Sequence, residues 1–214
     1  MAMHRRLAVR AWSSAAAVVA LGLGVAVATS AAAEPAAAAS SPDSKPGSTA
    51  AAPPPEAAAL SAKLQTYLFD AARAGHVAML REFINARYKL DTRDAKGYTP
   101  LILAAYHGHE DAVRLLISAG ADPCAQDNRG NTALMGAIFK AEVGVARLLM
   151  AAGCNPNQRN AAGQTPAMYA ALFGRLELLQ ALKIQGADLR APDAAGNTAE
   201  GLAQGRISTV PPSR

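Results

Sequence analysis

The sequence predicts an all-α solenoid, in which two-helix units stack side by side along one axis. The first observation is a period, because one pattern of Gly and Thr returns every 33 residues between Asp94 and Glu200. The second is that each period holds two short apolar stripes with helical spacing, the second of which ends at a glycine. The third is composition: Ala supplies about a quarter of the 214 residues, and Phe, Tyr and Trp number only four, five and one. So few aromatic residues disfavour a fold with a large aromatic core.

Four copies of one short segment carry the period. Each copy begins with Asp or Asn, has Gly three residues later and Thr two residues after that. The Gly and Thr pairs are Gly97 and Thr99, Gly130 and Thr132, Gly163 and Thr165, and Gly196 and Thr198. Several coupled positions that stay in phase over four copies indicate a repeat protein.

The helices of each unit follow from local signals. A Thr hydroxyl accepts a hydrogen bond from a free N–H at a helix start, and Pro at the next position lacks an N–H that would have no partner there. Thr99 is followed by Pro100, and the same pair returns at Thr165. A glycine turn such as Gly108 then leads into the second helix, which ends at a glycine such as Gly120.

With its period and its Thr-Pro-Leu signature at Thr99 to Leu101, this pattern resembles the ankyrin repeat. The resemblance covers Ser61 to about Arg206. It implies loops that project at right angles like β-hairpins, and the binding of another protein as the usual task. The sequence departs from the family where His normally follows Thr-Pro-Leu, since the residues there are Ile102, Met135 and Met168.

The predicted solenoid occupies residues 61–206 and divides at the period. It comprises a capping unit (61–93), the first unit (94–126), the second unit (127–159), the third unit (160–192) and a partial closing cap (193–206), with a tail at 207–214. Leu64 replaces the hairpin glycine in the capping unit, and only one helix fits in the closing cap. Atypical end units are expected, because each unit buries its apolar face only against its neighbours.

The second unit is predicted to be the least stable. Ala133 replaces the proline at its helix start, and Gly136 and Gly144 lie inside its helices. Each helical glycine costs about 1 kcal/mol relative to Ala. We therefore expect this unit to open locally more readily than its neighbours.

Residues 1–33 have the layout of a secretory signal peptide. A basic stretch with Arg5, Arg6 and Arg10 precedes an apolar run at 15–27, and small residues end at Ala33. We expect cleavage near Ala33 and a periplasmic or secreted product, similar to exported bacterial ankyrin-repeat proteins. The run is too short and too rich in Ala and Gly for a stable membrane span. A mitochondrial presequence remains open, as does the choice between the general and the twin-arginine export route.

Ala, Pro and Ser dominate residues 34–60, so we predict a disordered linker there. The signal peptide explains most of the formal charge of +5. Without Arg5, Arg6 and Arg10, 18 basic residues face 16 acidic ones, and the net charge is +2. A nearly balanced surface gives no electrostatic reason to expect nucleic acid as a partner.

The repeats show no catalytic or metal-binding motif. His107 and His109 lack a third ligand nearby, so we expect no metal and no cofactor. No Ser or Cys has a His at the spacing of a nucleophile and its base, which argues against an enzyme. We expect Cys124 and Cys154 to stay unbridged, because neighbouring units stack about 10 Å apart and a disulfide needs Cα atoms within about 7 Å.

The resemblance also assigns a binding surface, because the family binds through a concave face built from hairpin tips and the solvent side of the first helices. By register these residues are Lys96, Tyr98, Tyr106, His107, Arg129, Asn131, Phe139, Lys140, Gln164 and Phe173. The aromatic members would form an apolar centre, and the Lys and Arg members a mildly basic rim. An acidic or mixed protein surface would fit best. Alternatively, Phe139 and Phe173 complete the core instead.

The sequence therefore predicts an exported, monomeric, non-catalytic module that binds a partner protein on its concave face. Neither nucleic acid nor a lasting membrane span is expected. The alternative is structural: a spacer or envelope-stabilising protein without a specific partner, in which the linker matters more than the repeats.

Overall fold

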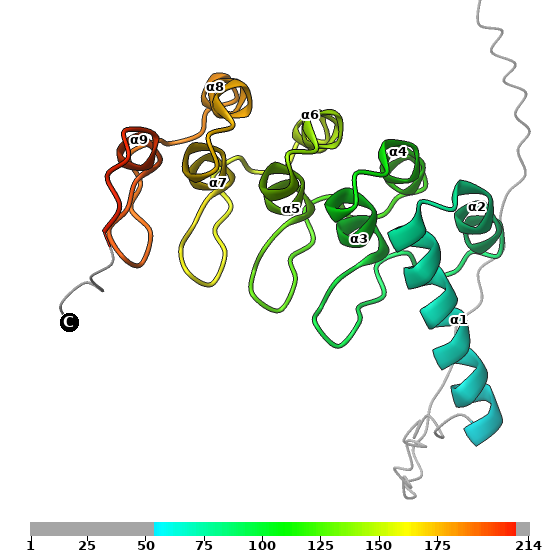
Figure 1. The fold of residues 1–214 in the computed structure, drawn as a ribbon. Coiled ribbons are helices and arrows are strands. Elements are labelled where there is room, and N and C mark those ends of the chain that lie inside the picture. The colour runs from blue at the N-terminus through cyan, green and yellow to red at the C-terminus, as the bar shows by residue number, and fades with distance from the viewer. Residues whose placement is uncertain (1–53, 209–214) are drawn as a thin grey trace, which may run out of the picture. The chain divides into compact units, whose positions relative to one another are not determined.

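A computed structural model describes residues 54–208 of the chain. Within this range lie nine helices: α1 (Pro55–Ala74), α2 (Val77–Asn85), α3 (Pro100–Tyr106), α4 (Glu110–Ser118), α5 (Ala133–Lys140), α6 (Val143–Ala151), α7 (Pro166–Leu172), α8 (Leu176–Ile184) and α9 (Ala199–Ala203). They form an inner row of odd-numbered helices and an outer row of even-numbered ones (Figure 1). The predicted all-α solenoid is confirmed. None of these helices combines the length and the apolar character needed to cross a membrane.

Four inner helices, α3, α5, α7 and α9, begin where the sequence predicts. The Thr hydroxyls at 99, 132, 165 and 198 accept hydrogen bonds from the backbone N–H three residues later, at 3.2, 3.3, 3.4 and 3.0 Å. Pro100 and Pro166 occupy the first helical position of α3 and α7. Each cap satisfies an N–H group that the helix itself leaves without a partner.

Small residues at one register position bring the inner helices together. Ala71, Ala104, Ala137 and Ala170 are spaced by 33 residues and are at most 1% exposed. The outer row contributes larger side chains at its own equivalent position, where Phe83, Leu116, Leu149 and Leu182 are buried. The core is therefore a continuous layer between the two rows, rich in Ala as the composition predicts.

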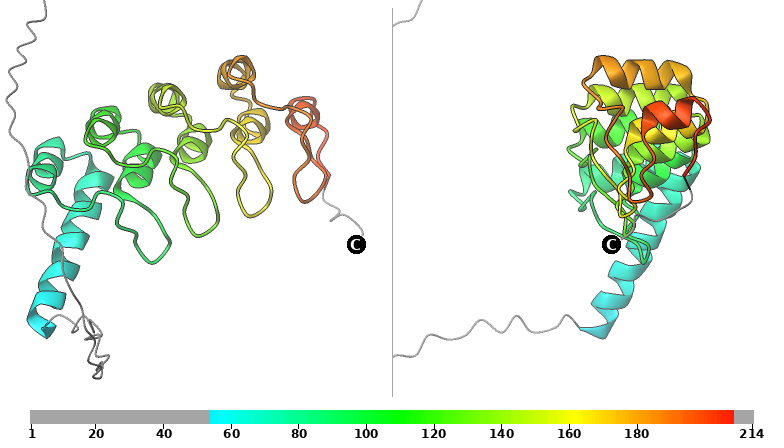
Figure 2. Two further views of the ribbon diagram at one scale, coloured as in Figure 1. Left: turned by 180° about the vertical axis from the view of Figure 1, so that it is seen from behind. Right: turned by 90° about the vertical axis from the view of Figure 1, so that its left-hand side faces the viewer.

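The loops between units form a continuous ladder on one side of the stack (Figure 2). In the first unit, Oδ1 of Asp94 accepts from the N–H groups of Lys96 and Tyr98, and the same turn returns at Asp127, Asn160 and Asp193. Gly97, Gly130 and Gly163 share a φ of 76–80°, which only glycine adopts readily. Backbone N–H groups of Asn128, Ala161 and Ala194 donate to the preceding loop at 3.0, 2.8 and 3.0 Å.

These loops are hairpin-like, although residues 54–208 contain no extended strand. The sole β pairing described there is an isolated bridge between Gln126 and Thr132. Side chains reinforce the ladder, since Nε2 of Gln126 donates to the carbonyl of Arg159, 33 residues further on, at 2.8 Å. The loops are thus fixed relative to one another before any partner binds.

The prediction of a disordered linker up to residue 60 is wrong at its end. Helix α1 begins at Pro55, so residues 55–60 are helical and lengthen the capping unit (Figure 1). Pro at the first helical position and Glu56 in the first turn both favour a helix start, and the alanines that follow have the highest helix propensity. The prediction relied on the Ala-, Pro- and Ser-rich composition of the segment and did not weigh these helix-start residues. The signal peptide, linker residues 34–53 and tail residues 209–214 lie outside the described residues.

The prediction that the cysteines stay apart is also wrong. Cys124 and Cys154 form a disulfide, and their Cα atoms are 5.5 Å apart. A stacking distance of about 10 Å separates residues at equivalent positions of neighbouring units. The two cysteines are not equivalent. Cys124 lies in the connection that follows the outer helix α4 and crosses toward the next unit, where Cys154 lies just after the end of α6 at Ala151.

In the neighbouring units, the residue equivalent to Cys124 also contacts the following unit. Asp91 holds this position in the capping unit, and its Oδ1 accepts from the N–H of Asp122 in the first unit at 2.9 Å. Asn157 holds it in the second unit, and its Oδ1 accepts from the N–H of Asp188 in the third at 2.7 Å. The disulfide therefore replaces a hydrogen bond that ties the other units together.

Candidate functional site

A groove of about 810 Å³ runs along the concave face, between the hairpin-like loops and the exposed side of α3, α5 and α7. Nine of the ten residues that the sequence assigned to this face line the groove: Lys96, Tyr98, Tyr106, His107, Arg129, Asn131, Phe139, Gln164 and Phe173. The tenth, Lys140, lies beside it, with its Nζ 5.3 Å from the centroid of the Tyr106 ring. All three full units contribute, so the groove exists only in the stacked protein.

An aromatic row crosses the three units inside the groove. The rings of Tyr106 and Phe139 are stacked, with centroids 6.3 Å apart, and Phe139 meets Phe173 edge to face at 5.0 Å. Tyr106 is 38% exposed and Phe139 is 42% exposed, whereas Phe173 is half-buried. Phe139 therefore does not complete the core. Aromatic surface of this kind costs little side-chain entropy to use and is typical of the centre of a protein interface.

Sequence reasoning missed Tyr169, which also lines the groove. Its ring lies 6.1 Å from that of Phe173 and continues the aromatic row. The signal was present, because residues one helical turn before Phe139 and Leu172 face the same side of their helices. The second unit has Gly136 at this position, which concealed the pattern.

The Tyr169 hydroxyl belongs to a polar network in the groove wall. It donates to Oδ1 of Asn131 at 3.0 Å, and Nδ2 of Asn160 donates to the same oxygen at 2.9 Å. Burial raises the pKa of Tyr169, so the phenol stays protonated and keeps donating. Asn131 also donates to Asp127 through Nδ2, at 3.1 Å. Asn131 thus lines the groove with both ends of its amide already bonded within the protein, which makes this wall rigid.

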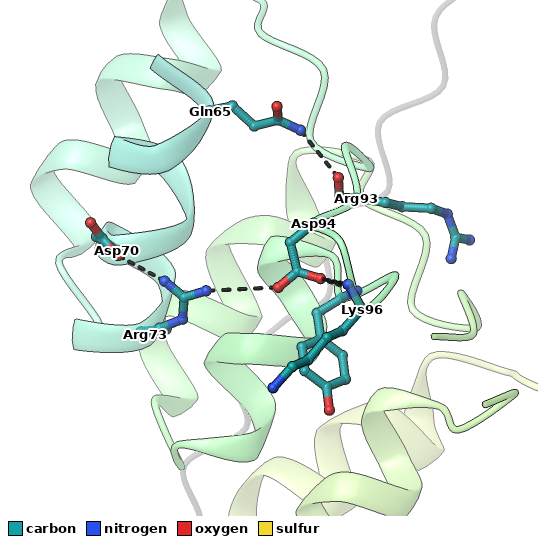
Figure 3. Close-up of polar contacts among 7 residues, drawn as sticks. Gln65, Asp70, Arg73, Arg93, Asp94 and Lys96 are labelled. Atoms are coloured by element: carbon teal, nitrogen blue, oxygen red, sulfur yellow. Dashed lines mark hydrogen bonds and ion pairs between the residues drawn. The ribbon is translucent and has the colours of Figure 1, made fainter. Parts of the chain in front are cut away.

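The two carboxylates of the groove, Asp94 and Asp127, accept hydrogen bonds that hold their own loops in shape. Asp94 accepts two backbone N–H bonds, and its other oxygen is 3.7 Å from the Arg73 guanidinium, which also pairs with Asp70 at 2.7 Å (Figure 3). Asp127 is buried and accepts from the N–H groups of Arg129 and Asn131. Neither carboxylate presents unsatisfied negative charge to the groove.

The cations of the groove are arranged differently. Within residues 54–208, the side chains of Lys96, Arg129 and Lys140 make no ion pair and no hydrogen bond. All three are exposed. The groove therefore combines an apolar aromatic floor with positive charge that the described part of the chain leaves uncompensated.

His107 and His109 have different places in the structure: His107 lines the groove, and His109 contacts the capping unit. Partial burial and the positive charges of His109, Lys140 and Arg73 lower the pKa of His107, which lines the groove as a neutral ring near pH 7. His109 instead lies with Nε2 2.7 Å from the carbonyl oxygen of Arg73, and so helps hold the capping unit. The described residues contain no cluster of three or more His, Cys, Asp or Glu that could hold a metal ion.

Comparison with protein families supports the architecture directly. The family model for ankyrin repeats (three copies) matches residues 56–127 and again residues 119–193. Together the two matches extend from α1 through α8 and cover more than half of the chain. No match was found among curated proteins.

Proposed function

Because the chain belongs to the ankyrin-repeat family, we propose that it is an exported, non-catalytic module that holds a partner protein in its concave groove. Ankyrin repeats generally mediate protein–protein interaction and are typically not catalytic. The groove lies within one chain, so a single copy suffices for binding.

The observation that carries this proposal is the exposed aromatic row. Tyr106 and Phe139 lie in equivalent positions of two units and expose 38% and 42% of their surface, although the core beneath them is complete without these rings. Large aromatic side chains are costly to leave in water and are the usual anchors of protein interfaces. A row that crosses several units fits a macromolecular partner better than a small ligand.

Export is supported by two separate features. The first is the order of basic, apolar and small residues at 1–33. The second is the Cys124–Cys154 disulfide, because such bonds persist in oxidising compartments and are rare in reducing ones. Mass spectrometry of the chain isolated from its own cells tests both, since we expect a first residue near Glu34 and a mass two hydrogens below that of the reduced protein.

Capture of a partner from an envelope extract tests binding. The groove variant carries Tyr98→Ala, Tyr106→Ala and Phe139→Ala. The matched control carries Met79→Ala, Leu176→Ala and Ile184→Ala, which remove three apolar side chains that are 43%, 64% and 78% exposed and lie outside the groove.

We expect the groove variant to lose the captured protein and the control to keep it, with unchanged helical circular dichroism in both. Capture that survives in the groove variant would place binding elsewhere. If even the unaltered chain retains no protein, binding itself fails, and the spacer role becomes the better explanation.

A further inference from the structure

Resting on the proposed function, we infer that the groove binds one extended segment of its partner protein, which is acidic at one end and apolar at the other. The acidic end of this segment lies over α3 and α5, and its apolar end lies over α7 and α9. The inference names the chemistry of the partner, which the family alone leaves open.

The charge of the groove is graded along the stack. At one loop position, the first, second and third units carry Lys96, Arg129 and Ala162. At the end of the inner helices, the equivalent residues are His107, Lys140 and Phe173. The loop position therefore carries a cation in the first and second units and none in the third. The helix-end position carries its one cation, Lys140, in the second unit, because His107 is neutral near pH 7. Positive charge gathers over the first two units and is absent from the same positions of the third.

The remaining carboxylates do not cancel this charge. Asp94 and Asp127 direct their oxygens to backbone N–H groups of their own loops, and Arg73 is paired with acids on both sides. Lys96, Arg129 and Lys140 form no ion pair within residues 54–208, so their charged groups are available to a negative ligand. Complementary charge of this kind steers association and selects among partners.

The far half of the groove has the opposite character. Its lining residues carry no formal charge: Gln164, Met168, Tyr169, Leu172, Phe173 and Leu202. Leu172 is 44% exposed, which leaves apolar surface for a partner side chain to cover. A ligand that is acidic along its whole length would leave its charges unpaired here, so the segment has to change character midway.

The dimensions fit a short stretch of polypeptide. Neighbouring packed helices lie about 8–10 Å apart, so the path from α3 to α9 is roughly 24–30 Å. An extended chain of about eight residues spans this distance at about 3.3–3.6 Å per residue. Gln164 also offers a hydrogen bond to such a backbone, because its Nε2 has no acceptor within residues 54–208.

Single-stranded nucleic acid is the main competing ligand, because aromatic rings and cations also bind bases and phosphates. It fits less well, since one phosphate per nucleotide would place charge along the uncharged third unit. The inference therefore commits to a peptide, and an oligonucleotide serves as a competitor in the test.

The experiment selects displayed random nine-residue peptides on the purified full chain with its disulfide intact. Three proteins are compared: the unaltered chain, the charge variant Lys96→Glu with Arg129→Glu and Lys140→Glu, and the floor variant Tyr106→Ala with Phe139→Ala. The three side chains are exposed and form no ion pair or hydrogen bond within residues 54–208, so the charge variant should fold normally. Circular dichroism checks this for both variants.

We expect peptides enriched by the unaltered chain to carry Asp or Glu in one half and aromatic or aliphatic residues in the other. The charge variant should select against acids, and the floor variant should enrich nothing. For the best peptide, replacing its acids by Gln should weaken binding about tenfold in fluorescence anisotropy, and added salt should weaken it further. A ten-nucleotide thymidine strand should not displace the peptide.

Three results would overturn the inference. If enriched peptides depend on Tyr106 and Phe139 but show no acidic bias, the groove binds protein of another kind and the proposed function stands. If the thymidine strand binds the groove more tightly than any peptide, the partner is nucleic acid. If enrichment is indifferent to both variants, the groove is not the binding site, and the proposed function fails as well.

Discussion

The second and third units share one backbone plan but are held together by different means. Helix α7 of the third unit begins with Pro166 and contains no glycine, and the turn that follows it contains Gly174, whose φ is 65°. Helix α5 of the second unit begins with Ala133 and contains Gly136, and Ala141, which caps its end at the equivalent position, has nearly the same φ of 66°. An L-residue other than glycine is strained in this left-handed conformation. The second unit is thus the weaker one by three separate local criteria.

The bonds that join each unit to the one before it have the opposite ranking, because the less stable second unit has the stronger bond. The third unit is joined to the second by a hydrogen bond from the N–H of Asp188 to Asn157. The second unit is joined to the first by the Cys124–Cys154 disulfide at the corresponding place. Residues at one register position can thus join neighbouring units through a hydrogen bond or through a disulfide. The disulfide lies in the unit whose helices are intrinsically less stable.

This difference matters for binding because the second unit forms the middle of the groove. It supplies Arg129 and Phe139 directly and Lys140 at the edge. Phe139 contacts one aromatic ring in each neighbouring unit, Tyr106 in the first and Phe173 in the third. If α5 opened, the aromatic row would break at its centre. The disulfide, which joins the second unit to the first and lies outside the groove lining, therefore also protects the candidate binding site.

Removing the disulfide should have the largest effect. In a chain with Cys124→Ala and Cys154→Ala, the free energy of unfolding should fall by about 3–4 kcal/mol, because the bond closes a loop of 30 residues. Urea denaturation of the oxidised chain and the variant measures the difference. A reductant should destabilise the oxidised chain by a similar amount and leave the variant unchanged. Equal midpoints for both proteins would mean that the bond contributes nothing to holding the second unit.

Local opening of the second unit should be the next largest effect. Once the disulfide is removed, we expect amides in α5 and α6 to exchange roughly 30-fold faster than those in α7 and α8, because two helical glycines together cost about 2 kcal/mol. Hydrogen exchange followed by mass spectrometry resolves the four helices. Equal protection in both units would show that stacking, rather than helix composition, sets local stability.

A smaller effect tests whether the disulfide and the hydrogen bond are interchangeable. Starting from the variant with both cysteines replaced by Ala, Asn at position 124 should accept from the N–H of Asn155, as Asn157 accepts from Asp188. We expect Cys124→Asn with Cys154→Ala to be about 1 kcal/mol more stable than the double Ala variant in urea denaturation. Asn157→Ala in the unaltered chain should lose a similar amount. No gain from Asn would contradict the equivalence of the two ties.

The smallest expected effect concerns the strained end of α5. Ala141→Gly should raise the free energy of unfolding by about 0.5 kcal/mol, since relief of the left-handed strain exceeds the added entropy of the unfolded chain. The matched reverse change is Gly174→Ala, where a new Cβ would meet no atom within 4 Å and only the backbone conformation is penalised. It should destabilise the protein. In thermal denaturation, Ala141→Gly should raise the melting temperature and Gly174→Ala should lower it. Shifts in the same direction would rule out backbone strain as the cause.

The features that sequence predicted well are those set by short-range signals repeated in phase. Thr99 and Thr165 cap their helices as expected, and the period assigned Tyr106 and Phe139 to one face without any coordinates. The two errors have different origins. Cys124 and Cys154 differ in register by three residues, so a spacing rule for equivalent residues did not apply to them. Residues 55–60 were assigned to the disordered linker because its Ala-, Pro- and Ser-rich composition outweighed the helix-start signal at Pro55.

Site-specific photocrosslinking gives the most direct test of a concave binding site. A photoreactive phenylalanine analogue is placed at position 139 in the groove, or at position 184 on the outer row as a control, and the full chain is irradiated in the cells that produce it. Phe139 is 42% exposed and Ile184 is 78% exposed, so the control probe is at least as accessible as the probe in the groove. We expect a crosslinked protein partner from position 139 and none from position 184. A partner trapped only from position 184 would contradict binding in the groove.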